Sequence, residues 1–185
     1  GNGAMAFEGD VTVCEEITAF KKIRFETHEN LGYGEVALPP EEMETEAVWI
    51  VPGPRAAEVL GRGSLGSGLL GIGNVLHHVA ALRLMCDPRD LGVAVQAVSQ
   101  ADGAPDGESL ALFLYDAHAG GVGLSANAFA DMDSLLEDAA RLVNGCPCAA
   151  GCPSCVGPVE EEGAPVKRLA EALLIALQGR FGGEA

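Results

Sequence analysis

Residues 146–155, CPCAAGCPSC, place four of the six cysteines of this 185-residue chain within ten positions. Their spacing is C-x-C-x3-C-x2-C, with two prolines and a glycine in between, and these residues favour tight turns. Such turns let a short segment bring four thiolates to about 2.3 Å from one metal ion. Disulfides are a poorer explanation because the chain shows no secretory signal and a Cys146–Cys148 bridge would be strained. The predicted metal ligands are Cys146, Cys148, Cys152 and Cys155.

The identity of the metal follows less directly from the pattern. Four thiolates suit tetrahedral Zn2+, and they also suit an iron–sulfur cluster. The bacterial ferredoxin pattern, C-x2-C-x2-C-x3-C, is similar to this one without matching it. We therefore expect zinc, with an iron–sulfur cluster as the alternative. A zinc ion closed by four thiolates has no open position for substrate, so its role would be structural. The isolated Cys14 and Cys86 are expected to be small buried apolar side chains.

Hydrophobic periodicity predicts strands early in the chain and helices late in it. A long apolar segment in the middle, ending at Met85, is expected to be a buried helix. The predicted fold class is α+β, with a mixed or antiparallel sheet and C-terminal helices flanking a four-cysteine zinc knuckle. Residues 1–9 are predicted to be a cloning remnant and leader, and residues 10–180 a single domain with its knuckle at 146–155. The predicted strands are 10–18, 20–25, 47–51, 93–99 and 110–115, and the C-terminal helices run from Ser134 to Gly145 and from Pro165 to Gly179.

Charge limits the partners that the isolated chain can bind. With 11 basic and 27 acidic residues its net charge is −16, which repels nucleic acid at long range. The compact basic cluster Lys21, Lys22 and Arg24 could contact phosphates, or it could be the solvated edge of a strand. No apolar run reaches the roughly 18 residues of a membrane span and no signal peptide is evident, so we expect no membrane partner and a cytoplasmic location.

Two further patterns have ordinary structural explanations. Gly61–Gly66 fits G-x-G-x-x-G, but no strand precedes it, so a flexible glycine-rich connection is expected rather than a dinucleotide site. A second polar site could combine His77 or His78 with nearby carboxylates, although satisfied core histidines are the commoner case. Asp116 precedes a glycine-rich turn, where a carboxylate usually binds backbone amides. The residues of this possible second polar site are His77, His78, Asp87, Asp90 and Asp116; no catalytic residue is predicted.

Four stretches together resemble a known family. They are TAFKKIRFETHENLGYGEVALPPEEMETEAVWI at 18–50, HHVAALRLMCDPRDLG at 77–92, LFLYDAHAGGVGLS at 112–125 and CPCAAGCPSCVG at 146–157. They resemble the C-terminal zinc-binding domain of bacterial DEAD/DEAH-box DNA repair helicases of the mitomycin-repair type. These helicases are related to RecQ4-like enzymes, and the domain also occurs in defence-system proteins. The resemblance runs from about Asp10 to Leu177.

The resemblance implies a function for the domain as part of a larger machine. It implies that the four cysteines hold one zinc ion in an accessory domain of an ATP-dependent 3′-to-5′ superfamily 2 DNA helicase that acts in DNA repair. The implied partners are the helicase motor domains and DNA, and ATP would bind only in the motor domains, whose motifs this chain lacks. The alternative is a protein-interaction scaffold, for example in an anti-phage defence complex, without DNA binding of its own.

Overall fold

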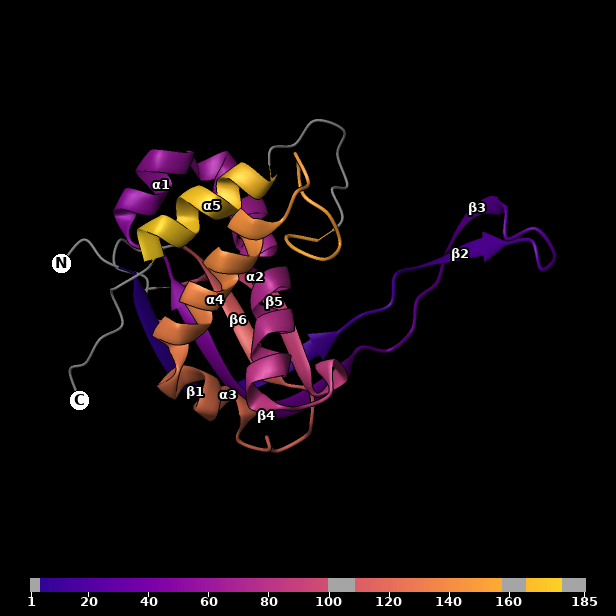
Figure 1. The fold of residues 1–185 in the computed structure, drawn as a ribbon. Coiled ribbons are helices and arrows are strands. Elements are labelled where there is room, and N and C mark those ends of the chain that lie inside the picture. The colour runs from indigo at the N-terminus through magenta and orange to yellow at the C-terminus, as the bar shows by residue number, and fades with distance from the viewer. Residues whose placement is uncertain (1–3, 100–108, 158–165, 178–185) are drawn as a thin grey trace.

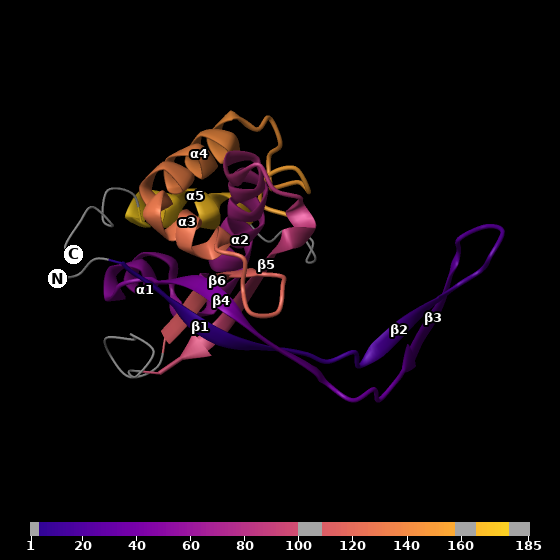
Figure 2. The same ribbon diagram turned by 90° about the horizontal axis from the view of Figure 1, so that it is seen from below.

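The computed structural model describes residues 4–99, 109–157 and 166–177 (Figures 1 and 2). It confirms the predicted α+β class, with an antiparallel sheet and a cysteine knuckle between two C-terminal helices. The main sheet has the strand order β1-β4-β6-β5, and a separate two-stranded sheet pairs β2 with β3. The strands are β1 Met5–Glu15, β2 Ala19–Ile23, β3 Asn30–Glu35, β4 Glu41–Val51, β5 Leu91–Val98 and β6 Ser109–Asp116.

The first strand begins earlier than the sequence indicates. The β1–β4 ladder runs from Met5 opposite Val51 to Glu15 opposite Glu41. The sheet therefore includes part of the predicted leader, and β4 begins at Glu41, before the predicted start at residue 47. In β4, Met43 and Thr45 are more buried than the glutamates that alternate with them, as expected for a half-buried strand. Residues 1–3 and 178–180, at the predicted boundaries, lie outside the described residues.

Helices cover one face of the main sheet (Figure 2). The core between the layers joins Ile50 and Leu112 from the sheet to Leu69, Leu135 and Leu173 from three helices, all fully or almost fully buried. On the opposite sheet face the rings of Phe7, Trp49 and Phe113 stack in a row, with centroids 5.8 and 5.5 Å apart. The helices are α1 Pro54–Leu60, α2 Arg62–Leu84, the 3-10 turn η1 Pro88–Asp90, α3 Leu124–Ala130, α4 Met132–Gly145 and α5 Val166–Leu177.

The glycine-rich segment is the first half of helix α2, so the expected flexible connection is wrong. Its glycines allow close packing: a Cβ on Gly71 would lie 3.0 Å from Val166 of α5, and one on Gly73 would lie 2.6 Å from Val93 of β5. Within the described residues, Gly63–Leu84 is also long and apolar enough to cross a membrane by length and composition alone. However, 61% of its apolar window is buried inside the protein, as in the core helix of a globular domain.

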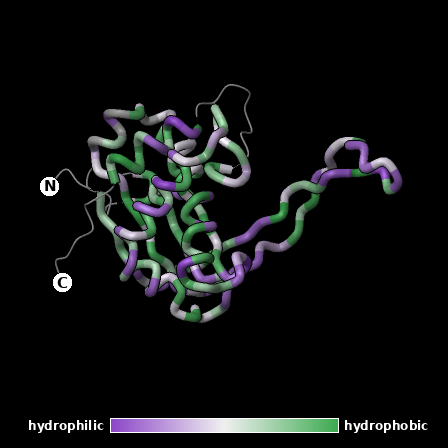
Figure 3. Tube along the Cα trace, viewed as in Figure 1, coloured by the Kyte–Doolittle hydropathy of each residue, from purple (hydrophilic) through white to green (hydrophobic). Residues whose placement is uncertain are grey.

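Between β1 and β4 the chain leaves the body as a long projection, here called the arm (residues 16–40), which ends in the β2–β3 hairpin (Figure 1). No arm residue belongs to either hydrophobic core cluster. Hydrophobic and hydrophilic residues alternate in short runs along it (Figure 3). Several of its apolar side chains are exposed, including Phe25 at 93% and Tyr33 at 69%. Such exposure is unusual for a surface that has no partner.

Candidate metal centre

The four predicted ligands converge after the end of α4. Of the described residues, only Cys146, Cys148, Cys152 and Cys155 form a group of three or more ligand side chains with all ligand atoms within 4.8 Å of one another. The Cys146 sulfur lies 3.5 Å from that of Cys148 and 3.6 Å from that of Cys152. The Cys155 sulfur lies 3.5 Å from those of Cys148 and Cys152. A disulfide requires about 2.05 Å, whereas a tetrahedral ion with bonds of about 2.3 Å separates its sulfurs by about 3.8 Å. The sulfurs therefore surround the space for a single ion.

This geometry favours zinc over a multi-iron cluster. In a cluster the cysteines bind different irons, so their sulfurs stand further apart than around one shared ion. Four thiolates around one ion are the donor set of a structural zinc site, and all four coordinating positions are filled. When bound, zinc would cross-link the end of α4 to the loop that follows it. The site has no open position for a reacting water.

Backbone turns shape the second half of the knuckle. The amide of Cys152 donates to the Cys155 sulfur at 3.3 Å, and the amides of Cys155 and Gly157 donate to the Cys152 carbonyl at 3.0 and 3.1 Å. Gly151 has a φ of 129°, a conformation that side chains other than glycine rarely adopt. These contacts hold Cys152 and Cys155 on one side of a tight turn, facing the other two cysteines.

The thiols of the knuckle have unequal acidities. Hydrogen bonding, first from the backbone amide of Cys148 and then from neighbouring thiols, lowers the pKa of Cys146 to about 7. Burial, together with bonding to the neighbouring thiols, raises the pKa of Cys148 to about 12. Burial also raises the pKa of Cys155. Cys146 is therefore the most readily ionised of these three ligands, and metal binding must displace protons from the others.

Two side chains outside the cysteine stretch bind the knuckle backbone, and the sequence analysis missed both. Asn74 of α2 donates to the Cys155 carbonyl at 2.7 Å. Lys167 of α5 donates to the carbonyls of Cys146 and Cys148 at 2.7 and 2.9 Å. The available signal was weak: Asn74 is a polar residue in an otherwise apolar stretch of α2, and Lys167 lies beside Arg168, from which the sequence does not distinguish it. Of the other two cysteines, Cys14 is exposed, because it lies on the solvent side of β1, so its predicted burial is wrong; Cys86 is partly buried.

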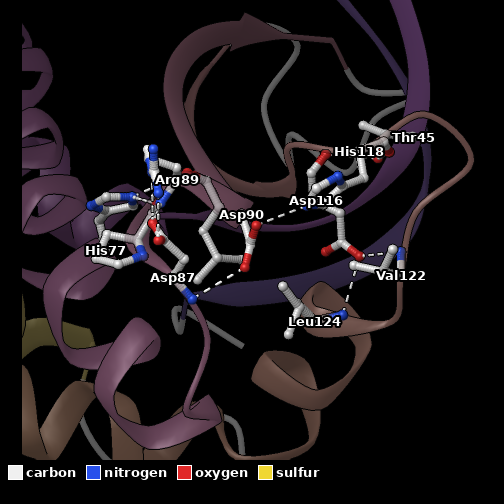
Figure 4. Close-up of polar contacts among 11 residues, drawn as sticks. Thr45, His77, Asp87, Arg89, Asp90, Asp116, His118, Val122 and Leu124 are labelled. Atoms are coloured by element: carbon white, nitrogen blue, oxygen red, sulfur yellow. Dashed lines mark hydrogen bonds and ion pairs between the residues drawn. The ribbon is translucent and has the colours of Figure 1, made fainter.

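The predicted second polar site is spread over several turns (Figure 4). Asp116 at the end of β6 is fully buried, and its carboxylate accepts hydrogen bonds from the amides of Val122, Leu124 and Ser125 at 2.6, 3.1 and 2.7 Å. Burial acts to raise the pKa of this carboxyl, but the amide hydrogen bonds outweigh it and the pKa lies below its usual value. Asp116 therefore holds the glycine turn at the start of α3, the structural role that the sequence also allowed.

Of the other four residues of this set, His77, Asp87 and Asp90 make contacts that hold turns in place, whereas Nδ1 of His78 is buried without a hydrogen-bond partner. Nε2 of His77 lies 2.7 Å from the Pro88 carbonyl, and the His77 and His78 rings meet edge to face with centroids 5.8 Å apart. Asp87 binds the guanidinium of Arg89, and Asp90 accepts from the Asp87 amide. Asp90 is also 2.9 Å from His118. These interactions tie α2, η1 and the loop after β6 together.

The predicted basic cluster lies on the arm, which projects away from the body that holds the knuckle (Figure 1). Lys21 and Lys22 belong to β2, and Arg24 pairs with Glu29 at 3.3 Å near the hairpin tip. The Phe20 ring lies over Gly34, and the Lys22 ammonium is 5.6 Å from the centre of that ring. One face of the hairpin thus carries an aromatic ring beside a cation.

Comparison with known proteins relates this fold to helicases. Residues 72–156, which include all four cysteines, match the family described as the MrfA Zn-binding domain. The chain is 42% identical over 159 residues to the uncharacterised ATP-dependent helicase YprA of Bacillus subtilis, a match that covers 86% of this chain and 20% of that protein. It is 26% identical over 130 residues to the ATP-dependent helicase HRQ1 of Saccharomyces cerevisiae, covering 64% of this chain and 12% of HRQ1.

Solved structures give the same relationship over nearly the whole chain. The fold is similar to that of the DUF1998 helicase MrfA bound to DNA, with a TM-score of 0.69 and 39% identity. That match covers 94% of this chain and 22% of the helicase. A second MrfA structure, bound to DNA and AMPPNP, is similar with a TM-score of 0.55 and 36% identity. The chain spans about one fifth of the length of YprA and MrfA.

Proposed function

We propose that this chain, whose residues 72–156 match the MrfA Zn-binding domain family, is an accessory domain of an ATP-driven 3′-to-5′ superfamily 2 DNA helicase that acts in DNA repair. The observation that carries the proposal is the similarity of 94% of the chain to a helicase solved with DNA. ATP hydrolysis would belong to motor domains that this chain does not match. The domain would act in the cytoplasm, where thiolates stay reduced, without a membrane partner.

In this proposal the body and the arm have different roles. The zinc knuckle braces α4 and α5 against α2 and keeps the body rigid. The arm reaches away from the body and contacts the DNA strand. Its cations can bind phosphates, and the Phe20 and Tyr33 rings can stack on unpaired bases, the combination used by proteins that bind single strands. Base stacking of this kind does not depend on sequence, which suits a helicase.

Charge makes the arm less unfavourable for DNA contact than the body: residues 16–40 carry three basic and four acidic residues, whereas the rest of the chain carries eight basic and 23 acidic residues. The chain carries a net charge of −16, so most of its surface repels a phosphate backbone. Lys21, Lys22 and Arg24 lie on the projecting hairpin, outside the body (Figure 1). Screening at physiological salt limits the repulsion between charges to about 8 Å, so a projecting arm can bind phosphate where the body cannot.

Binding of a forked DNA by this chain, measured by gel shift over a series of salt concentrations, tests the proposal. We expect binding that weakens steeply with salt, as phosphate contacts do. The variant K21A/K22A/R24A should lose it. A control variant, R89A/R141A/R168A, removes the same charge from exposed arginines outside the arm and should bind as the wild type does. Equal loss in both variants, or no binding at any salt, would count against DNA contact by the arm.

A protein-interaction scaffold is the second candidate, and the apolar surface of the arm favours it. The chain is 32% identical over 74 residues to the Druantia protein DruE of Escherichia coli, covering 40% of this chain and 4% of DruE. The exposed apolar side chains on the arm are Ile17, Phe20, Ile23, Phe25, Leu31, Tyr33 and Leu38. If they dock on a protein, substituting them would abolish that complex while the triple basic variant would leave it intact.

A further inference from the structure

Lys167, in the first turn of α5, has an unusual environment for a lysine. Lys167 is only 8% exposed. Among the described residues it is the one buried residue whose side chain carries a positive charge. Burying an ammonium group is costly unless hydrogen bonds and a nearby negative charge compensate it. A buried lysine therefore indicates that something anionic lies close by.

The hydrogen-bond partners of the ammonium are both in the knuckle. Its Nζ donates to the Cys146 and Cys148 carbonyls at 2.7 and 2.9 Å, and these two residues are also predicted metal ligands. The backbone amide of Lys167 donates to the Ala150 carbonyl at 3.2 Å. The first turn of α5 thus makes three hydrogen bonds to the knuckle, two of them to the C-x-C half.

Neither carbonyl carries a net charge, so the ammonium still needs a balancing anion. Glu171 is the nearest carboxylate contact, but its oxygen lies 4.0 Å from Nζ and its side chain is partly exposed. Four thiolates around one Zn2+ carry a net charge of −2. The thiolates of Cys146 and Cys148 belong to the residues whose carbonyls bind the ammonium. The metal centre is therefore the anion whose position best matches the buried cation.

We propose that Lys167 is a positioning residue of the metal centre, whose buried positive charge balances the thiolates and so retains the zinc ion. Asn74 supports the other pair of ligands, because it binds the Cys155 carbonyl of the C-x2-C half. Each pair of ligands is thus held by a side chain from a different core helix. This proposal concerns the metal centre alone, and its failure would leave the helicase assignment unchanged.

A simpler role for Lys167 makes a different prediction. Cys146 is the C-cap residue of α4, and a lysine near a helix C-terminus stabilises the last carbonyls whether or not a metal is present. Removing such a cap would lower the stability of the zinc-loaded and the zinc-free protein equally. If Lys167 instead balances the charge of the zinc centre, removing its charge would lower the affinity for zinc.

Zinc release to a chromogenic chelator, with competition titrations on the full 185-residue chain, distinguishes the two roles. For Lys167→Met we expect zinc affinity to fall by on the order of 10–100-fold, the usual effect of losing a group that supports metal ligands. Lys167→Arg keeps the charge and should stay within a few-fold of wild type. Arg168→Met removes an exposed charge from the adjacent position and should leave zinc affinity unchanged.

Further outcomes can overturn the proposal. Unchanged zinc affinity in Lys167→Met, or an equal loss in Lys167→Arg, would show that the charge does not retain the metal. An equal fall of the thermal midpoint with and without zinc would assign Lys167 to capping of α4. Glu171→Gln covers the case in which Lys167→Met does not fold: we expect unchanged zinc affinity, whereas a large loss would make Glu171 the balancing anion.

Discussion

Glu15 and Glu41 are the last cross-strand partners of β1 and β4, so the arm leaves the body at the end of an uninterrupted antiparallel ladder. The arm is in effect a long loop between two adjacent strands. The stability of the body and the function of the arm can therefore be tested separately.

Replacing residues 16–40 by a short turn containing Asn-Gly should leave the body folded. Such a turn joins antiparallel strands directly, and no arm residue belongs to a core cluster. We expect the thermal midpoint to change by no more than a few degrees and the zinc content to stay at about one per chain. Circular dichroism measures the thermal midpoint, and elemental analysis measures the zinc content. A molten or zinc-free product would show that the arm contributes to the fold of the body.

Substituting one ligand of the knuckle should remove the metal. In Cys152→Ser we expect zinc content to fall from about one per chain toward zero, because a hydroxyl is a poor substitute for a thiolate. Unfolding free energy should fall by several kcal/mol, since metal binding in such knuckles contributes directly to folding. Cys14→Ser, which changes an exposed cysteine far from the knuckle, is the control and should keep both properties. Bound iron with visible absorbance would instead indicate a cluster.

The buried carboxylate of Asp116 should matter for stability and for its pH dependence. The folded pKa lies below the unfolded value of about 3.9. Its contribution is therefore fully present above the unfolded pKa and is lost as the pH falls through the folded pKa. Asp116→Asn should cost about 2–4 kcal/mol at neutral pH, because amide donors lose a charged acceptor. Its stability should also change less between pH 5 and 2 than that of the wild type.

Urea denaturation at several pH values measures this effect. Asp10→Asn, on the exposed edge of β1, removes a carboxylate that binds no buried amide and should change stability by less than about 0.5 kcal/mol. Parallel pH profiles for the wild type and Asp116→Asn would show that another group governs acid unfolding.

Two glycines of α2 should respond differently to the same substitution. A Cβ on Gly73 would lie 2.6 Å from Val93 and 2.9 Å from Leu112, so Gly73→Ala should cost about 1–2 kcal/mol despite the better helix propensity of alanine. A Cβ on Gly68 would make ordinary contacts at 3.5–3.6 Å. Gly68→Ala should therefore be neutral or stabilise by up to about 1 kcal/mol. Thermal unfolding of both variants measures the difference, and equal effects would argue against close packing at Gly73.

The glycine-rich segment shows where local pattern is ambiguous. Gly61–Gly66 fits a nucleotide-binding motif, and glycine lowers helix propensity, so the pattern alone favoured a loop. Packing decides otherwise, because the absence of side chains lets α5 and β5 approach α2 closely. The early start of β1 was missed for a related reason: its ladder partners lie in β4, some forty residues away.

The sequence by itself determined which cysteines come together and the class of the fold. Four thiols within ten residues can converge through local turns, and thiolate chemistry then favours zinc. Strand and helix periodicity likewise depends on near neighbours along the chain. Only the tertiary structure showed that Asn74 and Lys167 hold the knuckle and that the basic cluster lies on a projecting arm. Their partners are distant in sequence, and which distant residues meet is decided by how the helices and the sheet pack around one core.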